Sequence, residues 1–139
     1  MNHENLNRLL ERIGDVNAKR RDLPLVTLEE FFAGNDDAGS IWCNVMCAPE
    51  PDEVFERLKS IRDREDVADV RIMVTQYDGG REEWPFSDTI FFVTSASEGD
   101  VRAWLGDEYQ PNEVWVDEFK RAERIDVPEG MAAIAAWWD

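Results

Sequence analysis

Apolar residues recur along the chain at two spacings, that of an amphipathic helix and that of a half-buried strand. Leu6, Leu9 and Ile13 follow the helical spacing, whereas Ile41–Cys47 alternates apolar and polar positions. The first spacing indicates a helix that buries one face, and the second indicates a strand. The whole pattern predicts helices near residues 3–13, 28–33, 51–63 and 98–105, and strands near 41–47, 67–77, 89–94, 113–117 and 131–138.

Residues with known end preferences mark several of these boundaries. Thr27 with Glu30, and Ser95 with Glu98, have the spacing of capping boxes, in which two side chains satisfy free amides at a helix start. Pro51 suits the first turn of a helix because its nitrogen has no hydrogen to leave unpaired. The helix after Ser95 should stop at Gly106.

The order from Ile41 onward is strand, helix, strand, strand, helix, strand. This order predicts an α+β domain with a ferredoxin-like (βαββαβ) antiparallel sheet, both long helices on one face, and an added N-terminal helix. Residues 1–22 would form that helix and a linker, and residues 23–139 a single domain. The N-terminal helix and the short helix after Thr27 would cover the other sheet face.

The last strand of the sheet has two candidates, residues 113–117 and 131–138, and using both would make the sheet five-stranded. The alanines of 131–138 also suit a helix, but Gly130 before them and two tryptophans after them favour a strand. If that strand is extended, Trp137 and Trp138 point to opposite faces, one into the core.

Charge limits the classes of partner. The formal net charge is −16 over 139 residues, and the stretch between Arg21 and Arg57 has nine acidic side chains and no Lys or Arg. Such a field repels nucleic acid and anionic membranes and attracts a basic protein. The nine are Asp22, Glu29, Glu30, Asp36, Asp37, Glu50, Asp52, Glu53 and Glu56.

The start of the chain has neither a basic nor an apolar targeting segment, and no apolar run reaches membrane-spanning length, so we expect a cytoplasmic protein. Cys43 and Cys47 would then be reduced, buried thiols, too far apart on one strand for a disulfide. A zinc site would need further Cys or His ligands, and only His3 remains, so we predict no metal and no cofactor.

The connection between residues 78 and 88 is the best candidate site. It combines two acids, Glu82 and Glu83, with two aromatic residues, Trp84 and Phe86. An aromatic anchor ringed by acids suits recognition of a basic partner, and Asp36 and Asp37 would add charge to this partner-binding surface. The alternative is that Trp84 or Phe86 folds back on the core.

No arrangement of residues predicts catalysis. Glu82 and Glu83 are adjacent, so on an extended loop their side chains point apart, which does not suit an acid/base pair. Ser95 and Ser97 have the pattern of helix caps and no partner base. We therefore predict no catalytic residues.

Three segments carry a resemblance. Leu28–Asn44 (LEEFFAGNDDAGSIWCN), Trp84–Ser97 (WPFSDTIFFVTSAS) and the closing Trp137-Trp138-Asp139 resemble a group of small, acidic, uncharacterised bacterial proteins, from Leu23 onward. The resemblance implies no catalytic residue. In size and charge the chain is also similar to immunity proteins of bacterial toxin systems.

These observations favour a non-enzymatic, acidic, protein-binding domain, of the inhibitor or immunity type, that masks a basic surface. The N-terminal helix would also serve a homodimer contact. The alternative is a small-molecule-binding or enzymatic domain with an aromatic pocket on a sheet face, lined by Trp42, Tyr77 or Trp138. A pocket with convergent polar groups would favour the alternative.

Overall fold

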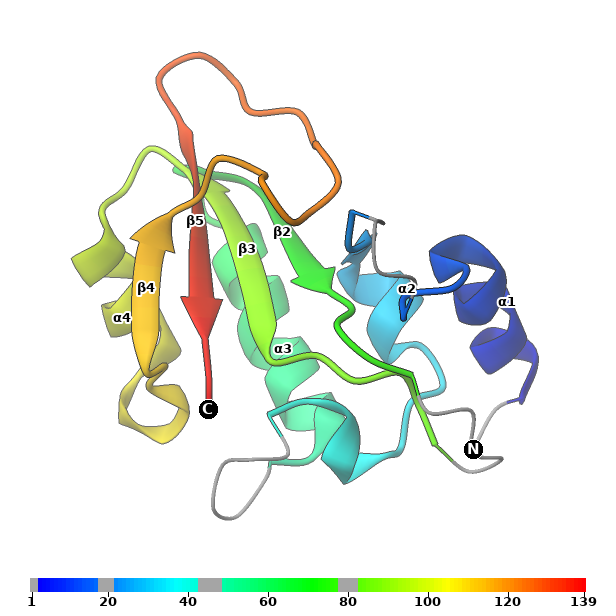
Figure 1. Ribbon diagram of the computed structural model, residues 1–139. Coiled ribbons are helices and arrows are strands. Elements are labelled where there is room, and N and C mark those ends of the chain that lie inside the picture. Colours follow the sequence, from blue (N-terminus) through cyan, green and yellow to red (C-terminus); the bar gives the residue numbers. More distant parts are fainter. Residues whose placement is uncertain (1–2, 18–21, 43–48, 78–82) are drawn as a thin grey trace.

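The computed structural model describes residues 3–17, 22–42, 49–77 and 83–139. A five-stranded antiparallel sheet runs through the protein, with strand order β1-β2-β3-β5-β4 (Figure 1). The chain is therefore an α+β protein with an open antiparallel sheet, which confirms the fold class predicted from the sequence. The strands are β1 Leu25–Thr27, β2 Val67–Met73, β3 Thr89–Thr94, β4 Glu113–Val116 and β5 Ala132–Trp137.

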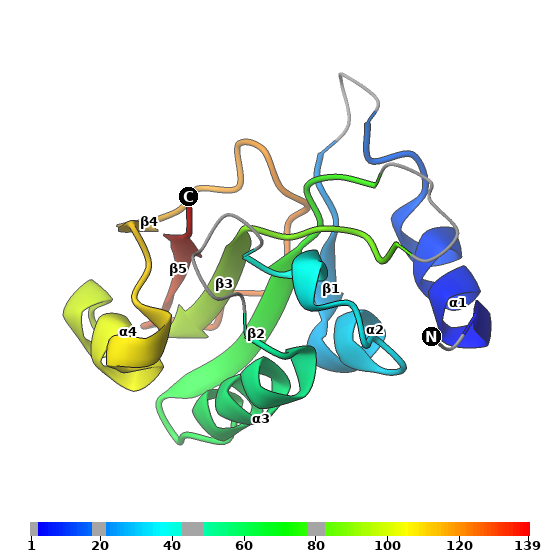
Figure 2. The ribbon, with the colours of Figure 1, turned by 90° about the horizontal axis from the view of Figure 1, so that it is seen from below.

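The helices pack against one face of this sheet (Figure 2). Apolar residues of all four helices share one core with the strand residues of that face, such as Ile72, Phe92 and Ile134. The four helices are α1 His3–Ile13, α2 Leu28–Phe32, α3 Pro51–Arg62 and α4 Glu98–Leu105, and two short 3₁₀ helices are η1 Ala38–Ser40 and η2 Asp107–Tyr109.

Local capping explains where the short helices begin. The Thr27 hydroxyl accepts from the Glu30 amide and the Glu30 carboxylate accepts from the Thr27 amide, so the first predicted capping box is confirmed. The second box lies two residues later than expected: Ser97 and Asp100 form it in place of Ser95 and Glu98. Gly106 ends α4 with a positive φ of 71°, which glycine adopts without strain.

The ferredoxin-like arrangement is not confirmed. That arrangement would insert strand 41–47 between β3 and the final strand, but β3 pairs directly with β5 over six residue pairs. Ile41 forms only an isolated bridge to Ser87, and residues 43–48 lie outside the described ones. The fifth strand is instead the three-residue β1, which extends the other edge beside β2.

The second sheet face is covered by a segment that the sequence did not single out. Residues 117–131, here called the crossing segment, pass over this face (orange in Figure 1). Phe119, Ala122 and Ile125 of this segment pack with Phe91 and Met73 of the sheet. The expectation that α1 and α2 cover this face is wrong, because their apolar side chains belong to the core on the opposite face.

Backbone pairing with the start of β1 holds the crossing segment in place. The Leu23 amide donates to the Arg121 carbonyl at 2.8 Å, and the Glu123 amide donates to the Leu23 carbonyl at 2.9 Å. The Glu123 carboxylate also accepts from the Leu25 amide and from Arg12 of α1, both at 2.8 Å. The segment is thus tied to the β1 edge after leaving β4 at the other edge.

Candidate functional site

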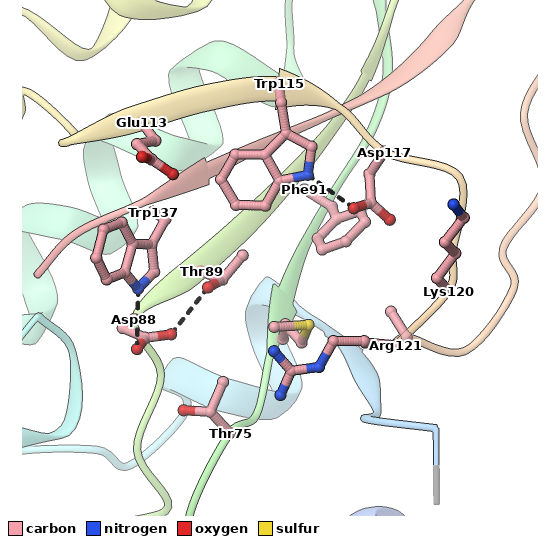
Figure 3. A pocket seen from close by; sticks show the side chains of 12 residues that line it. Thr75, Asp88, Thr89, Phe91, Glu113, Trp115, Asp117, Lys120, Arg121 and Trp137 are labelled. Carbon is pink, nitrogen blue, oxygen red and sulfur yellow. Dashed lines mark hydrogen bonds between the residues drawn. The ribbon is translucent and has the colours of Figure 1, made fainter.

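A pocket of about 540 Å³ lies between the crossing segment and the sheet face beneath it (Figure 3). Side chains of paired strand residues form the floor of the pocket, because directly paired residues of antiparallel strands point to the same side of the sheet. Met73 pairs with Thr89, Thr89 with Trp137, and Trp137 with Glu113, so these four side chains form one row across the sheet. A pocket of this volume matches the usual size of small-molecule sites.

The neighbouring row supplies two aromatic side chains to the pocket. Phe91 and Trp115 both pair with Ala135 of β5, so a methyl group lies between two rings. Ala135 is fully buried in this cluster, whereas Phe91 and Trp115 line the pocket. Trp115 and Trp137 are both half-buried, which leaves part of each indole open to the pocket.

Each pocket tryptophan is fixed by a carboxylate. The Trp137 indole nitrogen donates to Asp88 at 3.3 Å, and the Trp115 indole nitrogen donates to Asp117 at 2.8 Å. Asp88 also accepts from the Thr89 hydroxyl at 2.8 Å, and Asp117 from the Phe119 amide at 2.8 Å. These bonds fix the ring orientations and keep both carboxylates at the pocket wall, as Figure 3 shows.

Two charged residues of opposite sign line the same pocket and have no partner among the described residues. The Glu113 carboxylate and the Arg121 guanidinium make no ion pair or hydrogen bond with each other or with any other described residue. Figure 3 shows them on opposite sides, Glu113 from β4 and Arg121 reaching in from the crossing segment. Lys120, which also lines the pocket, lies 3.8 Å from Glu118.

The partner-binding residues predicted from the sequence lie elsewhere. Trp84 is 3% exposed and belongs to the main core, so its ring is not presented as an exposed anchor. Asp37 accepts from the Trp84 amide at 3.1 Å and from the Gly39 amide, so it supports this loop. Asp36 and Glu83 are exposed, Phe86 is half-buried, and Glu82 lies outside the described residues.

The aromatic residues proposed for a sheet-face pocket also lie elsewhere. Trp42 and Trp138 stack in the helix-side core with ring centroids 4.1 Å apart, and both are 1% exposed. Tyr77 packs against the same core. Trp137 and Trp138 do point to opposite faces, as predicted, but Trp137 is the one that lines the pocket. Cys43 and Cys47 lie outside the described residues.

Sequence reasoning missed most of the pocket because its residues come from four strands of the sheet and from the crossing segment. One signal was present: Trp115 alternates with Val114 and Val116 on a predicted strand, which places its ring on the face opposite Val114. The contribution of Arg121 depends on long-range pairing with Leu23, for which the local sequence holds no sign.

Two further findings concern the described residues alone. No set of three or more His, Cys, Asp or Glu side chains among them is arranged to hold a metal ion. Among those same residues, no helix has the length and apolarity needed to cross a membrane.

The fold and site define a small, acidic α+β protein whose antiparallel sheet has helices on one face and a tryptophan-lined pocket on the other. The chain belongs to the family described as "Uncharacterized protein YfbO family", whose model matches residues 4–137. It is 36% identical over 138 residues to "Uncharacterized protein YfbO" of Escherichia coli (strain K12), covering 98% of this chain and 97% of that protein. No solved structure matches the chain.

Proposed function

We propose that the protein is a binding domain for a small organic molecule, and that the sheet-face pocket is its site. One observation carries this proposal: aromatic rings and charged side chains, two of them unpaired among the described residues, converge on a single hollow of about 540 Å³. Ligand sites typically combine an apolar lining with a few well-placed polar groups. The pocket thus favours the small-molecule alternative over a purely protein-binding role, although on different aromatic residues from those expected.

A thermal-shift screen of small amphipathic molecules tests the proposal. Binding to the native state alone raises the unfolding temperature, and the rise should saturate with concentration. Hits should lose their effect in Trp137→Ala, because that change removes a pocket wall. Trp104→Ala is the matched control, since Trp104 is a half-buried tryptophan of α4, where it stacks on Arg64 on the helix side.

The opposite result is also defined. If no compound in a broad library gives a saturable shift, or if hits respond equally to Trp137→Ala and Trp104→Ala, the pocket is not the binding site. If the protein is instead an enzyme that acts in this pocket, a bound molecule should be converted to product. Chromatography of hits incubated with the protein would detect that conversion.

A second candidate function is binding of a basic protein, and a separate surface supports it. Asp52, Glu53 and Glu56 are exposed at the start of α3, and Glu108 lies across a shallow hollow from them. Burial, together with Glu53 and Glu108, raises the pKa of Tyr109 in the same hollow. The negative potential there is suited to a cationic partner surface, as in an inhibitor or immunity-type protein.

Finer expectations about assembly stay predictions. A homodimer through α1 would have to use its outer face, because Leu6, Leu9 and Ile13 already lie in the core. A location in the cytoplasm is likewise a prediction, and it needs its own evidence.

A further inference from the structure

We infer that the ligand of the sheet-face pocket is a small zwitterion, with an ammonium group and a carboxylate joined by an apolar body. This inference rests on the proposed function and specifies the chemistry of the molecule bound there. It follows from the separation of charge in the pocket, where the Glu113 carboxylate and the Arg121 guanidinium, neither of them paired with another described residue, face the same hollow from opposite sides.

One side of the pocket fits a cationic group. Glu113 is paired in register with Trp137, and the indole of Trp137 is bonded to Asp88, so two carboxylates adjoin one aromatic ring. Asp88 accepts one hydrogen bond at each oxygen, which leaves further lone pairs available. An ammonium group would find carboxylates for its N–H donors and an indole face for its charge.

The other side fits a carboxylate. Arg121 extends into the pocket, and its guanidinium presents a planar fork of N–H donors that matches a carboxylate bidentately. Its backbone is anchored, because the Leu23 amide donates to the Arg121 carbonyl at 2.8 Å and Ala122 next to it is 1% exposed. The guanidinium therefore projects from a fixed point of the crossing segment.

The middle of the pocket fits an apolar body. The indole of Trp137 and the side chain of Met73 lie in the row that crosses the sheet from Glu113, and Phe91 and Trp115 line the pocket from the next row. An apolar group placed there would lose contact with water against these side chains.

Charge balance excludes the simpler ligand classes. A polyanion such as a nucleotide would meet Asp88, Glu113 and Asp117 in the pocket, and a protein of net charge −16 around it. A simple cation could pair with the carboxylates, but it would offer nothing to the Arg121 guanidinium. A zwitterion satisfies both sides at once. Free amino acids and dipeptides with an apolar side chain share this chemistry.

Calorimetric titration with a matched set of probes tests the inference. The probes are phenylalanine, the dipeptide Ala-Phe, N-acetyl-Ala-Phe, Ala-Phe amide and the doubly blocked dipeptide. We expect phenylalanine or unblocked Ala-Phe to bind, and the one that binds more tightly shows whether the ligand is a free amino acid or a dipeptide. Blocking either end of the dipeptide should weaken binding about tenfold or more, because each removes a charge-assisted contact.

Two exposed charges supply the variants: Glu113→Gln conserves size, and Arg121→Gln keeps a polar side chain but shortens it and removes the guanidinium. Arg121→Gln should weaken the free dipeptide about tenfold and leave Ala-Phe amide unaffected, whereas Glu113→Gln should affect the N-acetylated form least. Arg124→Gln, three residues further along the crossing segment and outside the pocket lining, is the control and should change nothing.

The failures are distinguishable. If the blocked and free probes bind the pocket with equal affinity, or if Arg121→Gln and Arg124→Gln behave alike, the zwitterion inference is wrong while the pocket remains a ligand site. If zwitterions do not bind but uncharged or singly charged screen hits do, the zwitterion inference is again wrong and the pocket remains a ligand site. If nothing binds the pocket at all, the proposed function itself fails.

Discussion

Tryptophan residues have three different roles in this protein, and their surroundings decide which. Trp115 and Trp137 each donate to a carboxylate and present a half-buried ring to the pocket. Trp138 is buried and donates to the Tyr109 carbonyl at 3.1 Å. Trp84 is buried too, but its indole nitrogen has no acceptor among the described residues. A buried indole of this third kind, such as Trp84, contributes to stability through packing.

Replacement of Trp84 by Ala should therefore destabilise the fold. The ring is 3% exposed in the main core, so its removal leaves a cavity and should lower the free energy of unfolding by about 3–5 kcal/mol. Trp104→Ala removes a half-buried ring and should cost less. Urea melts of the two variants make the comparison, and a Trp84→Ala variant as stable as the wild type would contradict this placement.

At the scale of elements, sequence patterns predicted the helices, strands and caps that depend on residues close together in the chain. The helix from Pro51, the strand Thr89–Thr94 and the capping box at Thr27 depend on neighbours in sequence, and they are confirmed. The expected insertion of a strand between β3 and the final strand depended on which strands pair, which the alternation of apolar residues does not encode. The crossing segment follows from a distant pairing, Leu23 with Ala122, that no local pattern contains.

The ion pair between Glu29 of α2 and Arg62 of α3 predicts how stability depends on pH. Two hydrogen bonds of 2.8 Å from Arg62 hold the pKa of the Glu29 carboxyl below its usual range. A depressed pKa in the folded state stabilises the fold above the pKa of an unfolded glutamate, about 4.3, and this stabilisation is lost as pH falls through the folded pKa. The gain is small because the pair is exposed.

Carboxyl ¹³C shifts recorded between pH 2 and 7 measure this titration directly. Glu29 should titrate at lower pH than in the Arg62→Met variant, where the hydrogen bonds are absent. Equal midpoints for Glu29 in both proteins would show that the ion pair does not persist in solution.

At the scale of the whole molecule, a net charge of −16 acts on every partner before contact. Its field extends about 8 Å at physiological ionic strength, and we expect it to disfavour nucleic acid. Acids at the start of α3 concentrate the field on the helix side, whereas the pocket carries both signs on the other side. The two candidate functions thus occupy different surfaces and can be tested separately.

Binding of a basic protein should be sensitive to salt and to the α3 surface. Capture of a basic partner should weaken steeply between low and molar salt, because screening removes the attraction between exposed charges. Changing Asp52, Glu53 and Glu56 together to the amide forms should weaken capture in the same way, while small molecules still bind the pocket. Acidic partners retained equally in molar salt would contradict the electrostatic account.

The central claim is that the sheet-face pocket binds the ligand, and indole ¹⁵N–¹H spectra test it most directly. During titration with a hit from the screen, the Trp115 and Trp137 indole signals should move together and saturate at one dissociation constant, because both rings line the site. The Trp104 signal should stay in place, since that ring lies on α4 and stacks on Arg64. Saturable binding that moves Trp104 and leaves Trp115 and Trp137 unchanged would contradict the account.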